Sequence, residues 1–215
     1  AGHQAEDRRR DPERAVLMRA GLLRTGLTRL GRRWARLWRD RRGAMIAEFA
    51  ASIPMMLILV MSGTEISRFI ILQQKLDRAT TAVADLISQE EDITTAEVNA
   101  VFDAIPSILS PYTFTGKGTF IVTSVVLEGT TLKVAWQRNS GGSFAATSKI
   151  GTPGGSATLP TGLTIRTNET IVISESFYRF EPMFVPSSFT SWLAAETTYH
   201  QAFYRPRFGA LTTID

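Results

Sequence analysis

One long apolar run constrains the fold of this chain more than any other feature. Ala44–Gly63 reads AMIAEFAASIPMMLILVMSG and contains a single ionisable side chain, Glu48. About 20 apolar residues in a helix span the hydrocarbon core of a bilayer, and a soluble core helix seldom has so few polar positions. Pro54 favours a kink, which membrane helices tolerate. The run therefore predicts a transmembrane helix over residues 44–63.

The helical pattern continues beyond this run, because residues 64–88 contain no glycine or proline. Apolar side chains recur there at helical spacing while charged side chains become frequent. We therefore expect one helix from about residue 44 to residue 88. Its first half would lie in lipid, and its continuation over residues 64–88 would pack on a soluble head.

The charge of the chain is concentrated at its N-terminus. Residues 1–43 contain 13 arginines and 5 acidic residues, whereas the remainder is mildly acidic. A basic arm next to an apolar span indicates orientation, because arginines stay on the cytoplasmic side. Arg39, Arg41 and Arg42 are the candidate orienting residues, and we expect no nucleic-acid partner.

Residues 89–215 predict an α+β head. Thr94 and Glu97 fit a capping box at the start of a helix over about 95–109. Strand patterns follow at 118–129 and 130–139, joined at Glu128-Gly129, and at 169–183 and 197–208, with a loop at 139–163 that could hold a short edge strand. We expect about four antiparallel strands, with both helices on one face of the sheet.

A set of apolar side chains at inward positions predicts the core of the head. These are Leu76, Val83, Leu86, Phe102, Ile121, Val125, Val134, Trp136, Ile171, Ile173, Phe177 and Phe203. Phe184, Phe189 and Trp192 flank a possible helical turn at 187–194. These three aromatic residues would form either part of the core or a contact surface.

Groups that could carry out chemistry are scarce. The chain has no cysteine and two histidines, His3 and His200, which is too few for the usual metal sites or catalytic triads. The acidic run at 90–92 lacks the ligand spacing and the glycine of a calcium loop. Phosphate-binding glycine loops and a nucleophile elbow are also absent from the sequence. We therefore expect no enzyme activity, no catalytic residues, no metal and no cofactor.

The start of the apolar run resembles the cleavage region of type IV prepilins and pseudopilins. A basic leader ends at Gly43, and Glu48 is the fifth residue after that glycine. The resemblance implies cleavage after Gly43 by a prepilin peptidase, which would make Ala44 the new N-terminus and residues 1–43 a cleaved leader. A leader of this length is long for the family unless the natural start is Met18.

Residues 41–88 resemble more closely the N-terminal segment of the TadE/TadF-like pseudopilins of the tight-adherence (Tad, Flp) pilus system. The matching features are Glu48-Phe49-Ala50, then Pro54, then Glu65 at the polar exit; Tyr204-Arg205-Pro206-Arg207 resembles the C-terminal end. The resemblance implies a minor pseudopilin in the bacterial inner membrane, crossing it once with a cytoplasmic N-terminus and a periplasmic head. Glu48 and Phe49 would then act in assembly.

The partners implied by the resemblance are the prepilin peptidase, the Flp major pilin, a partner TadE/TadF-type pseudopilin and the inner-membrane pilus platform. Two other interpretations remain. One is an uncleaved signal-anchored envelope protein with a periplasmic binding domain. The other is a secreted protein cut near residue 62, which the missing small-residue cleavage motif disfavours.

Overall fold

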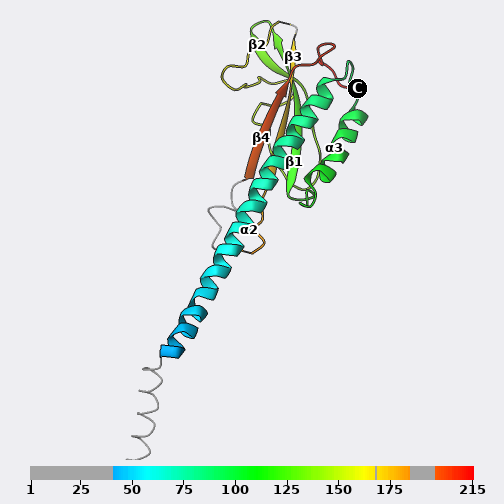
Figure 1. Cartoon of the computed structure of the whole chain (residues 1–215). Helices are drawn as coiled ribbons and strands as arrows, with labels where there is room; N and C mark the ends of the chain where they lie inside the picture. Colours follow the sequence, from blue (N-terminus) through cyan, green and yellow to red (C-terminus); the bar gives the residue numbers. More distant parts are fainter. Residues whose placement is uncertain (1–40, 168, 185–196) are drawn as a thin grey trace, which may run out of the picture. The chain divides into compact units, whose positions relative to one another are not determined.

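The structure is a computed structural model, and it describes residues 41–167, 169–184 and 197–215, with only the backbone of Arg41 and Arg42. Arg39, Phe189 and Trp192, together with the expected turn at 187–194, lie outside the described residues. The chain divides into two compact units, residues 1–59 and 60–215. Figure 1 labels the elements named below.

Two helices confirm the expected pattern. Helix α2 spans Arg41–Ser88, so the helix does continue past the apolar run, and helix α3 spans Thr95–Leu109. The capping box at the start of α3 is present: the Thr94 N–H donates to Glu97 Oε2 at 2.8 Å, and the Glu97 N–H donates to Thr94 Oγ1 at 3.3 Å. The Thr94 hydroxyl also donates to Glu97 Oε2, at 2.9 Å, and the backbone and hydroxyl donors of Thr94, the backbone one first, lower the pKa of the Glu97 carboxyl.

Four strands form one antiparallel sheet, as the sequence predicts. They are β1 (Gly118–Glu128), β2 (Thr131–Asn139), β3 (Thr170–Arg179) and β4 (Thr197–Tyr204), in the spatial order β2-β1-β3-β4. Glu128 pairs with Thr131 across the β1–β2 hairpin, and Gly129 in the turn has a φ of 62°. This left-handed conformation favours glycine, which explains the Glu128-Gly129 signal in the sequence.

The main core lies between the helices and one face of the sheet. Alternate residues of a strand point to opposite faces. Phe120, Val122 and Val172 therefore face the helices, where they join the buried residues Leu72, Leu76, Ala79, Val83 and Ile87 of α2 and Val98, Phe102, Ile105 and Leu109 of α3. Helix packing on one face is thus as expected.

The opposite face of the sheet is also covered, which the sequence pattern did not indicate. Val125, Ile171 and Ile173 point to this face and form a second buried cluster with Ile150 and Ile165. The segment between β2 and β3 supplies these last two residues. The Val134 N–H donates to the carbonyl oxygen of Gly155, and a bridge joins Lys133 to Ser156, so this segment pairs briefly with β2. The short edge strand considered for this loop is not formed as a strand, and only this isolated bridge takes its place.

Two of the predicted core residues differ from expectation. Leu86 is 47% exposed, because Val83 and Ile87 face the sheet and a helical residue one position earlier than Ile87 points about 100° away from it. Phe203 is half-buried because it lies on the edge strand β4. The other ten predicted core residues are buried. Phe184 is 44% exposed and does not belong to the core.

Candidate functional site

The expected processing junction lies on an uncovered stretch of α2. Gly43 and Ala44 are exposed, and a Cβ atom added at Gly43 would meet no atom within 4 Å. No positive φ is recorded for Gly43 either. The fold of the described chain therefore does not require glycine at this position. A glycine costs a helix about 0.5–1 kcal/mol relative to alanine, so a reason for it has to come from outside the fold.

The two residues expected to act in assembly are equally open. Phe49 is 68% exposed, and Glu48 is also exposed. The Ser52 hydroxyl donates to the backbone carbonyl of Glu48 at 2.8 Å, which leaves the Glu48 carboxylate outside this contact. Both side chains are thus available to a partner or to the bilayer interface.

The large apolar side chains of the run are exposed in the described part of the chain. From Met45 to Met61 its large side chains are 41–73% exposed. The helix has the length and composition needed to cross a membrane, and none of its most apolar stretch is buried within the protein. A soluble protein would not leave so large an apolar surface in water. The helix is therefore consistent with a single-pass membrane anchor.

The orienting arginines are described only in part. Arg41 and Arg42 belong to the first turn of α2, while Arg39 lies outside the described residues. Their assignment to the cytoplasmic side remains a prediction from the charge pattern.

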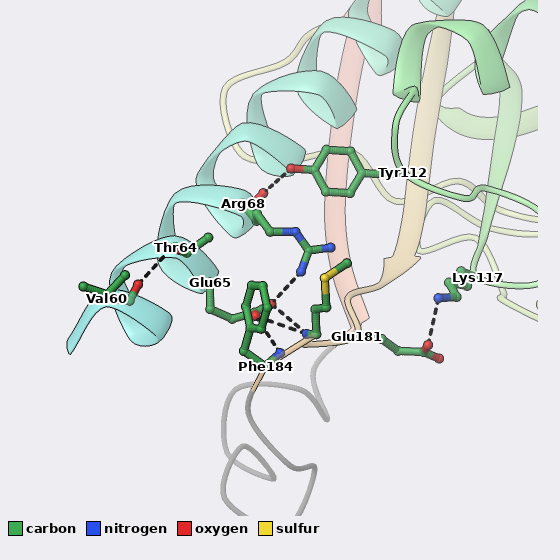
Figure 2. A network of polar contacts seen from close by, with 9 residues as sticks. Val60, Thr64, Glu65, Arg68, Tyr112, Lys117, Glu181 and Phe184 are labelled. Atoms are coloured by element: carbon green, nitrogen blue, oxygen red, sulfur yellow. Dashed lines mark hydrogen bonds and ion pairs between the residues drawn. The ribbon is translucent and has the colours of Figure 1, made fainter. Parts of the chain in front are cut away.

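A buried carboxylate marks the point where α2 first meets the head (Figure 2). Glu65 is only 3% exposed, and it is the first buried side chain along α2 from Gly43 onward. Its carboxylate accepts the backbone N–H of Met183 at 3.1 Å and that of Phe184 at 3.2 Å. These two residues follow β3, so Glu65 fastens the helix to the chain beyond the end of that strand.

Arg68 completes the environment of Glu65. Its guanidinium donates to the Glu65 carboxylate at 3.1 Å and lies 5.9 Å from the centre of the Phe180 ring. The Tyr112 hydroxyl donates to the backbone carbonyl of Arg68 at 2.7 Å, and burial raises the pKa of Tyr112. The sequence resemblance placed Glu65 at the polar exit of the helix but gave no sign of Tyr112, Met183 and Phe184 around it, because these residues lie more than 40 residues away in the sequence.

The C-terminal Tyr204-Arg205-Pro206-Arg207 segment closes the other end of the head. The Arg207 guanidinium pairs with Asp85 at 3.0 Å, and the Arg207 N–H donates to the carbonyl of Ser88, the last residue of α2. Arg205 pairs with Glu169 at 3.5 Å. This segment therefore fixes the exit of β4 to the end of the long helix.

A second buried carboxylate, missed by sequence reasoning, lies under the β2–β3 segment. Glu175 is fully buried and accepts hydrogen bonds from the Ser148 hydroxyl, the Lys149 N–H and the Tyr199 hydroxyl. Burial and the adjacent carboxylate raise the pKa of Tyr199. Its position could have been noticed, since Glu175 stands at an inward position between Ile173 and Phe177. The contacts with Ser148 and Lys149 bind the segment to the sheet, while the contact with Tyr199 joins β3 to β4.

Metal ligands do not gather in the described part of the chain: no three His, Asp or Glu side chains lie close enough together to hold an ion. His200 approaches Gln73 and Asp77 on α2, and burial lowers its pKa. His200 therefore lies between strand β4 and helix α2.

Comparison with known protein families gives a match over most of α2. Residues 43–85 match the model of the family described as TadE-like protein. No curated protein and no solved structure matches the chain. The matched range begins at Gly43, includes Glu48, Phe49 and Glu65, and ends within the part of α2 that packs on the sheet. The chain therefore carries a TadE-like segment over residues 43–85, as its sequence resemblance to the TadE-like pseudopilins of the Tad pilus indicated.

Proposed function

We propose that this chain is a minor pseudopilin that takes part in assembling or priming a Tad/Flp pilus. A prepilin peptidase removes residues 1–43 by cutting after Gly43, and residues 44–63 then hold the protein in the inner membrane. Residues 64–88 continue the helix into a periplasmic head formed by residues 89–215. The protein acts by binding its partners and catalyses no reaction.

One observation carries this proposal. The family match starts at Gly43, and the fold of the described residues does not require a glycine at this helical position. The match then continues along the apolar run, whose large side chains are exposed. Recognition of Gly43 by a peptidase accounts for the glycine. Contact with lipid or with other helices accounts for the exposed apolar side chains. An uncleaved signal anchor would account for the second feature but not for the first.

Glu48 has a physical task in this scheme. Cleavage creates an ammonium group on Ala44, and Glu48 follows it by about one helical turn. An ammonium and a carboxylate about 4 Å apart attract by about 4 kcal/mol at an effective dielectric constant of 20. Because both groups lie at the edge of the bilayer, a pair within one subunit or between neighbours favours insertion of the helix among other pilin helices. Phe49 is exposed next to it and supplies apolar contact.

The test is the N-terminal sequence and intact mass of the protein from its native membrane. We expect a chain that begins at Ala44, and we expect the longer form in a strain without the prepilin peptidase. Gly43→Leu should retain the leader. Gly63→Leu is the matched control, because Gly63 is also a helical glycine with nothing within 4 Å of an added Cβ. A wild-type chain that retains residues 18–43 would overturn the proposal and favour the uncleaved anchor.

A second experiment separates cleavage from assembly. Glu48→Gln keeps the shape of the side chain and removes its charge. We expect this variant to be processed normally but to support little or no pilus on the cell surface. Normal piliation by Glu48→Gln would refute the role given to Glu48 and leave the cleavage reaction standing.

A further inference from the structure

The base of the head, where α2 enters it, exposes large apolar side chains from two elements. Met61 and Ile66 of α2 are 43% and 55% exposed, and Met183 and Phe184 beyond β3 are 66% and 44% exposed. Isolated exposed apolar residues are normal on protein surfaces, but a contiguous group indicates a binding surface.

These four side chains belong to one patch. Glu65 lies one helical turn after Met61 and directly before Ile66, and its carboxylate holds the backbone N–H groups of Met183 and Phe184 within 3.2 Å. Figure 2 shows the Phe184 ring beside Glu65 on α2. All four residues therefore lie close to Glu65, and we call them the basal patch.

We propose that the basal patch lies in the interfacial layer of the membrane that holds α2, with Met183 and Phe184 inserted among the lipids. The occupant of the surface is thus a lipid surface. This inference rests on the membrane-anchoring part of the proposed function and not on cleavage or pilus assembly.

Continuity with the apolar run is the first argument. Met61 belongs to both the basal patch and the run, and only Ser62, Gly63, Thr64 and Glu65 separate it from Ile66 on the same helix. The apolar rings and chains of Phe and Met gain free energy at the boundary between water and hydrocarbon. Lipid that surrounds the run up to Met61 therefore also reaches Met183 and Phe184, which Glu65 binds one helical turn further along α2.

The hydrogen bonds of Glu65 give the second argument. Met183 and Phe184 are outside helices and strands, and a backbone N–H without a partner costs several kcal/mol near lipid. Glu65 satisfies both N–H groups, while Arg68 neutralises the carboxylate from the head side. A segment that only faced water would have no need of this arrangement, since water would supply the acceptors.

The charged groups around the patch are placed as an interface requires. The Arg68 side chain is 27% exposed, and Lys117 pairs with Glu181 at 2.8 Å. Long basic side chains at the end of a membrane helix extend toward the polar headgroups while their apolar stems remain near the hydrocarbon. The base of the head thus combines apolar side chains with two ion pairs whose basic side chains can reach the headgroups, which suits a lipid surface.

The absence of cysteine from the sequence allows a direct test. Single cysteines are introduced in the full chain by Met183→Cys and Phe184→Cys, labelled with a nitroxide and reconstituted in nanodiscs of phosphatidylethanolamine and phosphatidylglycerol. Accessibility to oxygen, which concentrates in lipid, is compared with accessibility to a water-soluble nickel chelate. Met61→Cys is the reference inside the apolar run. Phe208→Cys is the matched control, because Phe208 is 68% exposed and lies beside Thr170, at the opposite end of β3.

We expect labels at 183 and 184 to give a ratio of oxygen to nickel accessibility several-fold higher than the label at 208 and close to that at 61. If 183 and 184 resemble 208 while 61 is in lipid, the inference is wrong and the anchor stands. If both reagents are excluded at 183 and 184, a protein covers the patch and the lipid assignment is wrong. If 61 itself contacts water, the proposed membrane anchor fails together with the inference.

Discussion

Replacing Glu65 by alanine tests the link between the long helix and the head. The substitution removes the acceptor of the Met183 and Phe184 N–H groups and the partner of Arg68. It leaves helix α2 intact, because alanine is the best helix former. The damage should therefore appear in the attachment of residues 183–184 and in the stability of the head.

The magnitude follows from the contacts. A hydrogen bond to a charged group contributes about 1.5–3 kcal/mol, and Glu65 accepts two from the backbone. The Arg68 side chain is 27% exposed, so water can solvate its guanidinium once Glu65 is gone, and loss of this pair adds no more than about 1 kcal/mol. Because the substitution also removes the cost of burying the Glu65 carboxylate, which is only 3% exposed, part of this loss is offset, and we expect a total loss of about 2–4 kcal/mol in the free energy of unfolding. Glu65→Gln retains one acceptor oxygen and should lose about half as much.

Denaturant unfolding of the full chain in detergent, followed by circular dichroism, measures this loss. Hydrogen exchange of the segment that contains residues 183 and 184 locates it. Glu90→Ala is the control, because Glu90 is exposed and its replacement should change the stability by no more than about 0.5 kcal/mol. An unfolding midpoint for Glu65→Ala equal to that of the control, with unchanged exchange at 183–184, would refute the reasoning.

Three further predictions concern the head. Leu76→Ala should lower the free energy of unfolding by about 2–5 kcal/mol because Leu76 is fully buried, whereas Ile70→Ala, at a 49% exposed position, should cost far less in the same denaturant titration. Thr94→Ala removes the cap of α3 and should cost about 1 kcal/mol, measured as a lower thermal midpoint. Burial lowers the pKa of His200 in the folded state, so the unfolded chain binds more protons just below pH 6.5; stability should fall as the pH drops through this window and level off below the folded pKa. His200→Gln should lack this component of the pH profile, and an identical profile for the variant would contradict it.

Local sequence signals determined much of the fold. The capping box at Thr94 and Glu97 predicted the start of α3 because both partners lie within one helical turn. Glu128-Gly129 predicted the β1–β2 hairpin because the turn needs a left-handed residue. The helical spacing of apolar residues beyond Gly63 predicted one continuous helix, which α2 confirms.

The sequence predicted burial less well where burial depends on an element that is distant in the sequence. Leu86 fits the apolar stripe of the helix as well as Val83 does, yet only the placement of the sheet decides which of the two is covered. The second face of the sheet is buried because the β2–β3 segment folds over it. Its loop-like composition does not carry the periodicity from which burial is inferred.

The sequence by itself determined the long apolar helix, the TadE-like segment over residues 43–85 and the order of helices and strands, because these features depend on neighbouring residues or on composition. Only the tertiary structure decided what Glu65 and Glu175 do. A carboxylate in a sequence is a charge expected in water, and it becomes a structural link only when donors from distant segments close around it. For Glu65 those donors come from 118 and 119 residues further along the chain, and no local pattern encodes that approach.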